Sequence, residues 1–111
     1  MDVVQGFSIA SLMDSMPVKL KSEECLNLKL RVGFDFTDID KQYTVSIRRG
    51  VAEVVDRKLG NAQASVSVSS RVWKNIVTQQ RNPVASLASG ELQVDGSIRD
   101  LLHFLSLFER E

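Results

Sequence analysis

The fold of this chain is decided by residues 26–36, which read LNLKLRVGFDF. Every second residue from Leu26 to Phe36 is apolar, and the residues between them are polar or glycine. Successive side chains of a strand point to opposite faces of a sheet, so the alternation predicts a long strand with one buried and one wet face. The buried face needs a covering layer, and the apolar helix that we predict from Ser97 to the end of the chain supplies it.

Size and composition predict one soluble domain that spans residues 1–111. The chain has 14 basic and 14 acidic residues, so it carries no net positive field. This balance excludes a nucleic-acid partner and does not favour an anionic membrane surface. No apolar run approaches the roughly 20 residues of a transmembrane helix, and the N-terminus lacks the pattern of a secretory signal. We expect a cytoplasmic protein, or a periplasmic or secreted one if the sequence belongs to a larger exported protein.

Four further segments complete the predicted sheet. A second strand alternates from Tyr43 to Arg48, and Arg49-Gly50 predicts a tight reversal into a third strand. Three strands joined by short turns predict an antiparallel meander. The remaining segments are a turn at residues 38–41, the third strand at 51–56, a loop at 56–63, a fourth strand at 64–69, and a fifth strand at 91–95 between Gly90 and Gly96.

Helices account for most of the rest of the chain. Ser8 is a candidate cap for a first helix, and Pro17 predicts that this helix ends or kinks at Met16. A second helix begins at Ser69 or Ser70 and ends at Asn82-Pro83, and a short helical turn follows at 84–88. Each helix carries an apolar stripe, formed by Ile9, Leu12, Met13 and Met16 in the first and by Val72, Trp73, Ile76 and Val77 in the second. The order of elements predicts an α+β fold with its helices on one face of the sheet.

The last helix is more apolar than a lid requires. Its apolar side chains cover an arc of about 160°, whereas a helix that sits on a core needs about 100°. The surplus predicts contact with a second helix, a partner chain or a ligand cavity. The residues on the arc are Ile98, Leu101, Leu102, Phe104, Leu105 and Phe108, and Leu107 widens it.

The sequence offers no set of residues for catalysis. Catalytic zinc takes three protein ligands, mostly histidines, and this chain has one histidine, His103, on the polar flank of the last helix. The single Cys25 excludes an internal disulfide, and we expect it to be a buried structural thiol. No phosphate-binding glycine loop and no Gly-x-Ser-x-Gly elbow occurs. We therefore expect neither a metal nor a cofactor.

Two groups of charged residues have simpler explanations than a binding site. The acidic residues Asp35, Asp38 and Asp40 lack the glycine and the distal glutamate of a calcium loop, and we expect a solvated turn in which they bond local backbone amides. Lys29 and Arg31 lie on the wet face of the first strand. We interpret them as solubilising charges, with contact to a second domain as the alternative.

Four segments together resemble a known family. They are residues 18–20 (VKL), residues 34–38 (FDFTD), the strand at 43–50 with its charged turn, and residues 90–96 (GELQVDG) before the apolar helix. This pattern is similar to the sterol-carrier-protein-type-two fold, and most similar to the C-terminal domain of bacterial alkyl sulfatases. The resemblance implies a five-stranded, mostly antiparallel mixed sheet with helices on one face. Pro17 departs from the family pattern, which has a helix-compatible residue there, and the sequence holds neither the zinc hydrolase domain nor the dimerisation domain of a complete sulfatase.

The resemblance also implies a function, the non-catalytic binding of lipid, fatty-acyl or alkyl chains in an apolar tunnel between sheet and helices. The ligand would be a fatty acid, fatty alcohol, alkyl sulfate or sterol-like lipid, and the domain would recruit substrate for a sulfatase. The residues that we expect to converge on such a ligand are Leu12, Met13, Met16, Trp73, Val77, Leu101, Leu105 and Phe108. Judged from the residues alone, the favoured interpretation is that these side chains simply fill the core, and only the resemblance makes ligand binding an equal alternative. The alternative function is an interaction or dimerisation module that docks its apolar last helix on a hydrolase domain or a second copy.

Overall fold

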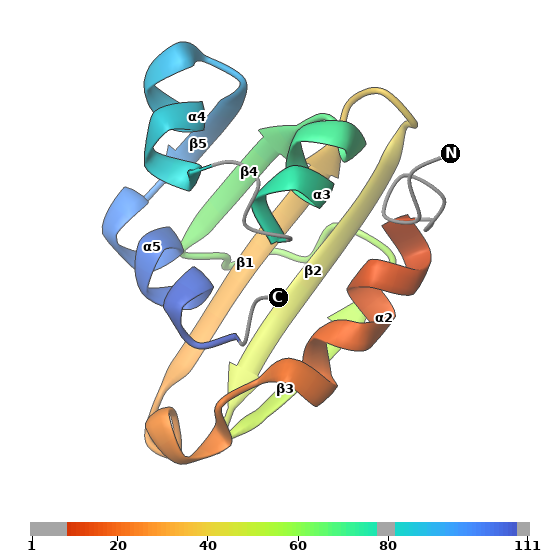
Figure 1. Cartoon of the computed structure of the whole chain (residues 1–111). Coiled ribbons are helices and arrows are strands. Elements are labelled where there is room, and N and C mark those ends of the chain that lie inside the picture. Colours follow the sequence, from red (N-terminus) through yellow and green to blue (C-terminus); the bar gives the residue numbers. More distant parts are fainter. Residues whose placement is uncertain (1–8, 78–81, 109–111) are drawn as a thin grey trace.

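The computed structural model describes residues 9–77 and 82–108, and Figure 1 shows the arrangement of their helices and strands. Ser8, the predicted cap of the first helix, lies outside the described residues. The elements are α2 (Ile9–Lys19), the 3-10 helix η1 (Ser22–Glu24), β1 (Lys29–Phe36), β2 (Lys41–Arg48), β3 (Val51–Val55), β4 (Ala64–Val68), α3 (Ser70–Val77), α4 (Pro83–Ser89), β5 (Leu92–Gly96) and α5 (Ile98–Ser106).

The five strands form one mixed sheet in the order β3-β2-β1-β4-β5. β1, β2 and β3 form the predicted antiparallel meander, β4 pairs parallel with β1, and β5 pairs antiparallel with β4. The turn between β2 and β3 has positive φ at Arg49 and Gly50, as the predicted tight reversal requires. The predicted fold class, an α+β fold with a five-stranded mixed and mostly antiparallel sheet, is confirmed.

Two predicted boundaries at the start of the chain are wrong. Helix α2 does not end at Met16 but continues through Pro17 to Lys19, so of the two predicted outcomes, an end or a kink, the end is wrong. Proline removes one backbone hydrogen bond, but buried side chains on both sides of it, Met16 and Leu20, hold the segment against the core. The first strand begins at Lys29, and Leu26 is exposed because η1 and a turn occupy residues 22–27.

The segment around Asn82 also differs from the prediction. The predicted course of the second helix over residues 78–81 lies outside the described residues. Asn82 begins a helix, because its side-chain oxygen accepts hydrogen bonds from the backbone N–H groups of Val84 and Ala85. Pro83 then occupies the first position of α4, where its missing N–H has no helical partner to lose. The predicted single turn is therefore a seven-residue helix.

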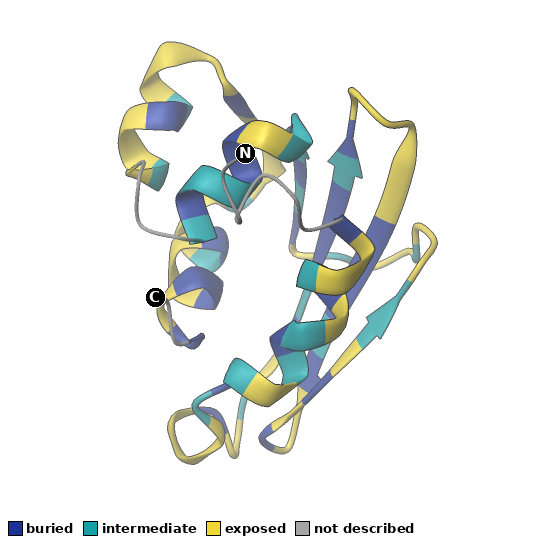
Figure 2. Cartoon of the chain, turned by 45° about the vertical axis from the view of Figure 1, so that its right-hand side comes forward, coloured by how far each residue is buried: buried dark blue, intermediate teal, exposed yellow. Residues whose placement is uncertain are grey.

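Helices α2, α3 and α5 cover one face of the sheet, and the core lies between these two layers (Figure 2). Phe34 stands at its centre, with its ring centroid 4.8 Å from that of Trp73 and 5.8 Å from that of Phe104. Phe104 in turn lies 4.9 Å from Phe108. A line of aromatic contacts thus connects the strands with the end of α5.

The other face of the sheet is crossed by residues 56–63, which connect β3 to β4. Thr44 holds this segment by donating a hydrogen bond to the carbonyl of Arg57 and accepting one from the N–H of Leu59. Arg31 donates to the carbonyl of Gly60 at 2.7 Å and to the hydroxyl of Ser46 at 3.0 Å. Arg31 therefore anchors a loop instead of serving only as a solubilising charge.

Candidate functional site

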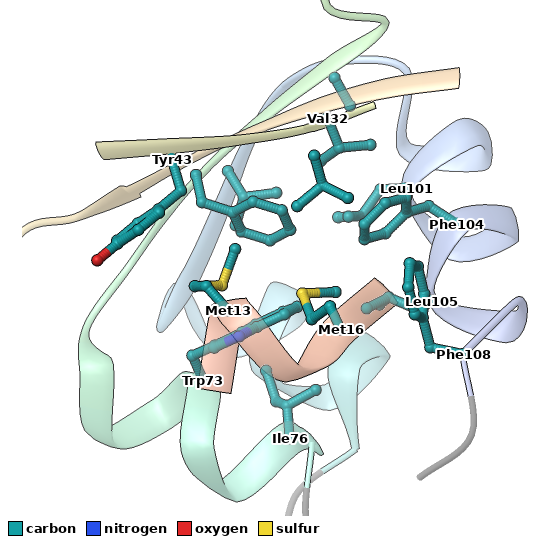
Figure 3. Close-up of a cluster of buried hydrophobic side chains, with 14 of the residues drawn as sticks. Met13, Met16, Val32, Tyr43, Trp73, Ile76, Leu101, Phe104, Leu105 and Phe108 are labelled. Carbon is teal, nitrogen blue, oxygen red and sulfur yellow. The ribbon is translucent and has the colours of Figure 1, made fainter. Parts of the chain in front are cut away.

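The candidate site is an apolar slot between α2, α3 and α5. Its walls combine residues 12–19 of α2, the side chains of Trp73 and Val77 on α3, and Leu105 and Phe108 in and just after the end of α5. Figure 3 shows Met16, Trp73, Leu105 and Phe108 converging from these three helices. The residues that line the slot are Leu12, Ser15, Met16, Lys19, Trp73, Val77, Leu105 and Phe108.

The α2 wall of the slot follows from helix periodicity. Leu12, Ser15, Met16 and Lys19 are spaced by three, four and seven residues, so they lie on one stripe of the helix. At 1.5 Å per residue the stripe extends the slot for about 10 Å along α2. The Ser15 hydroxyl already donates to the carbonyl of Leu12 at 2.7 Å. The ammonium of Lys19 is thus the charged group on the lining, at the end of α2.

A short backbone pairing joins α2 and α5 at this end of the slot. Leu20 forms an antiparallel bridge with Phe108, and the N–H of Lys21 donates to the carbonyl of Leu107 at 2.7 Å. The Lys21 ammonium donates to the carbonyl of Ser106 as well. These bonds fix the ends of the two helices relative to each other, so any widening of the slot has to occur farther along α2.

The slot is narrow. Its cavity volume is about 30 Å³, which holds one or two water-sized groups. A long hydrocarbon chain needs several times this space, so α2 must separate from α3 and α5 to admit one. Because the contacts between the walls are apolar and Met16 is an adaptable side chain, the separation breaks no ion pair among the lining residues.

The structure brings together six of the eight predicted ligand-binding residues and separates two. Met13 and Leu101 are not among the lining residues, and both are fully buried in the core between the helices and the sheet. Ser15 and Lys19 line the slot and were not predicted. Ser15 and Lys19 follow Leu12 by three and seven residues, so helix periodicity alone puts them on the same face as Leu12. Because both are polar, we expected them to face solvent.

The apolar surplus of the last helix is largely used inside the molecule. Leu101, Phe104, Leu105, Leu107 and Phe108 are all buried, whereas Ile98 and Leu102 are 44% and 37% exposed. The arc is wide because α5 packs on the sheet while Leu105 and Phe108 also line the slot that α2 shares. Little of it is left for a partner chain.

The charged and reactive residues outside the slot have structural roles. Asp38 accepts hydrogen bonds from the hydroxyl of Ser70 at 2.6 Å and from its N–H at 2.8 Å. These bonds, the hydroxyl first, lower the pKa of Asp38 together with a bond to its own backbone amide, and they clamp the first turn to the start of α3. Burial, with Glu23 and Glu24 nearby, raises the pKa of the Cys25 thiol, which favours its neutral form.

Within residues 9–77 and 82–108, no cluster of three or more histidine, cysteine, aspartate or glutamate side chains is arranged to hold a metal ion. In the same residues, no helix has the length and apolar character needed to cross a membrane. Larger hollows exist on the surface, such as one of about 350 Å³ beside Lys29 and Arg48, but this one is more open to solvent than the slot and its lining includes several charged side chains. The slot is the candidate because of its chemistry rather than its volume.

The architecture belongs to the sterol-carrier-protein-like class of α+β domains. Palmitated sterol carrier protein 2-like 2 from Aedes aegypti has this fold with a TM-score of 0.63 and 13% identity, over 90% of this chain and 92% of that one. A stereoselective inverting sec-alkylsulfatase from Pseudomonas sp. matches with a TM-score of 0.89 and 15% identity, over 96% of this chain but 17% of that one.

The chain belongs to the alkyl sulfatase C-terminal family, which matches residues 1–111. A linear primary-alkylsulfatase from Pseudomonas sp. (strain ATCC 19151) is 23% identical over 110 residues, which are 99% of this chain and 21% of that protein. The resemblance predicted from four short segments is confirmed. The chain spans about a fifth of the length of the curated relatives that it matches.

Proposed function

We propose that this chain binds the hydrocarbon chain of a lipid, fatty-acyl or alkyl ligand in the slot, without catalysing a reaction on it. In a longer alkyl sulfatase the same binding would recruit alkyl sulfate for the hydrolase domain. The observation that carries the proposal is the convergence of three helices on one apolar slot with Lys19 at its end. The structural neighbour from Aedes aegypti, whose solution structure is of the palmitated protein, supports the ligand class.

The energetics favour a flexible chain over a rigid ligand. Each methylene that moves from water into an apolar site contributes roughly 0.8 kcal/mol before ordering costs. Separation of α2 from α3 and α5 costs a fixed amount, because it exposes the same side chains, Met16 and Trp73 among them, whatever the ligand. A chain must therefore exceed a minimum length before its burial outweighs the cost of opening.

A calorimetric series from decyl to hexadecyl alcohols, sulfates and acids on delipidated protein tests the proposal. Affinity should rise steeply with chain length, by up to about fifteenfold for each pair of added methylenes. It should level off when the chain outgrows the slot. An affinity that does not depend on chain length would refute hydrocarbon binding.

A matched pair of variants locates the binding. Val77→Trp fills the slot with a bulky ring and should abolish binding, because Val77 lies on the lining and is only partly buried. Val84→Trp places the same ring on the exposed side of α4 and should leave binding unchanged. Equal losses in the two variants would mean that the ligand binds elsewhere.

A further inference from the structure

The neutral net charge of the chain conceals an uneven distribution in space. Residues 18–29 and 48–51 form one end of the molecule, called here the basal end (Figure 1). They are held together by the cross-strand pair of Lys29 and Arg48 and by close packing of Leu26 and Ser22 against Gly50. The basal end has five basic and two acidic residues, which leaves nine basic and twelve acidic residues in the rest of the chain.

The basal end also carries the most exposed apolar side chains in the described part of the chain. Val18 is 86% exposed, Val51 66% and Leu26 58%, and the other exposed large hydrophobic residues reach 55% at most. A single exposed aliphatic residue is ordinary on a protein surface. Three such residues at one end of the molecule, beside a cluster of basic side chains, form a surface that is both apolar and positively charged.

The basic side chains of the basal end repel one another. Lys29 and Arg48 are directly opposite each other on β1 and β2, and like charges in this position repel. Arg49 and Gly50 follow in a tight turn with φ values of 54° and 76°, so Arg49 stands at the tip of the sheet. Glu23 and Glu24 on η1 offset part of the charge. An anionic surface against the tip would relieve the remaining repulsion.

We infer that the basal end docks on an anionic lipid surface. Its cations would meet the phosphate groups, and its aliphatic side chains would enter the boundary between headgroups and acyl chains. An acidic protein surface would satisfy Arg48 and Arg49 but would offer no apolar counterpart to Val18, Val51 and Leu26. This inference is linked to the proposed function, because Lys19 belongs to both the basal end and the slot lining, so docking brings the slot to the lipid surface.

Co-sedimentation with lipid vesicles tests the inference. The chain should bind phosphatidylcholine vesicles that contain phosphatidylglycerol, should bind pure phosphatidylcholine vesicles far more weakly, and should dissociate as salt is raised. The double substitution Arg48→Gln with Arg49→Gln should weaken binding at least tenfold. The double substitution Val18→Ser with Val51→Ser should weaken it about fivefold or more. These four side chains are exposed, so the variants should keep the fold, which circular dichroism checks.

The control substitutions remove the same kinds of side chain from surfaces away from the basal end. Lys41→Gln removes a cation from the opposite end of β2, and Val84→Ser with Ile98→Ser removes exposed aliphatic groups from α4 and α5. All should bind vesicles like the unmodified chain. No binding to anionic vesicles, binding that ignores lipid charge and salt, or equal losses in basal and control variants would overturn the inference.

A titration with decanol in the absence of vesicles separates this inference from the proposed function. The basal variants should bind decanol with unchanged affinity, because Arg48, Arg49, Val18 and Val51 do not line the slot. Charge-dependent vesicle binding without decanol binding would leave the docking surface standing and overturn the slot. Decanol binding without vesicle binding would support the slot and overturn the docking surface.

Discussion

Two leucines one helical turn apart on α5 allow the slot to be distinguished from the core. Leu105 lines the slot, whereas Leu101 is buried toward Val32 on the sheet side (Figure 3). Substitution of either residue by alanine should lower the free energy of unfolding by about 2–5 kcal/mol, with Leu101 toward the upper end because it is almost fully enclosed. The two variants should nevertheless respond differently to a ligand.

The difference can be worked out from the atoms removed. Leu105→Ala removes three carbon atoms from the slot wall, which makes room for about as many ligand methylenes at roughly 0.8 kcal/mol each. Decanol should therefore bind this variant about 2 kcal/mol more tightly than the unmodified chain. Leu101→Ala creates its cavity away from the slot, so its decanol affinity should equal that of the unmodified chain.

Urea unfolding followed by the fluorescence of Trp73, the single and buried tryptophan, measures both effects. In saturating decanol, Leu105→Ala should regain more stability than the unmodified chain gains, and Leu101→Ala should gain only as much. Equal recovery of the two variants would refute the assignment of the slot. So would a complete lack of stabilisation in all three proteins.

Three further predictions concern the frame around the slot. Asp38 stabilises the fold above about pH 4, and this contribution disappears as the pH falls through its lowered pKa, so Asp38→Asn should remove that step from the pH dependence of unfolding. Weakening of the hydrogen bonds from Ser70 should also cost about 1 kcal/mol at neutral pH. Because burial raises its pKa, the Cys25 thiol should react with a disulfide reagent at neutral pH only after the protein unfolds. Gly96→Ala should destabilise the fold by at least about 2 kcal/mol in thermal denaturation, because φ is +103° and the new methyl would lie 2.5 Å from the carbonyl oxygen of Gln63.

Patterns with a short period predicted the sheet well. The alternation around Phe34 and the Arg49-Gly50 turn depend on neighbouring residues alone, and the structure has both the strand and the reversal. The start of β1 was predicted too early because Leu26 continues the alternation, although its side chain packs beside Gly50 in an exposed turn. The alternation of apolar residues does not indicate where the pairing of a strand with its neighbouring strand ends.

The slot could be predicted only in part, because it depends on distant contacts. Apolar stripes identified Leu12, Met16 and Phe108, but the polar lining residue Lys19 depends on how α2 meets α5 through the pairing of Leu20 and Phe108. The predicted helix end before Pro17 was wrong for the same reason, since tertiary packing maintained the helix.

The role of Asp38 could not be predicted from local sequence either. Its partner Ser70 is 32 residues away, so the nearest backbone amides were the expected hydrogen-bond donors. The turn and α3 come together only when β4 pairs parallel with β1.

The position of a bound hydrocarbon chain tests the central claim most directly. In a protein with labelled methionine, leucine and valine methyl groups, nuclear Overhauser contacts to decanol should appear at Met16, Val77 and Leu105. They should be absent from Leu101, which faces the core, and from the exposed Val84. Contacts confined to exposed residues, with none to Met16 or Leu105, would contradict the account.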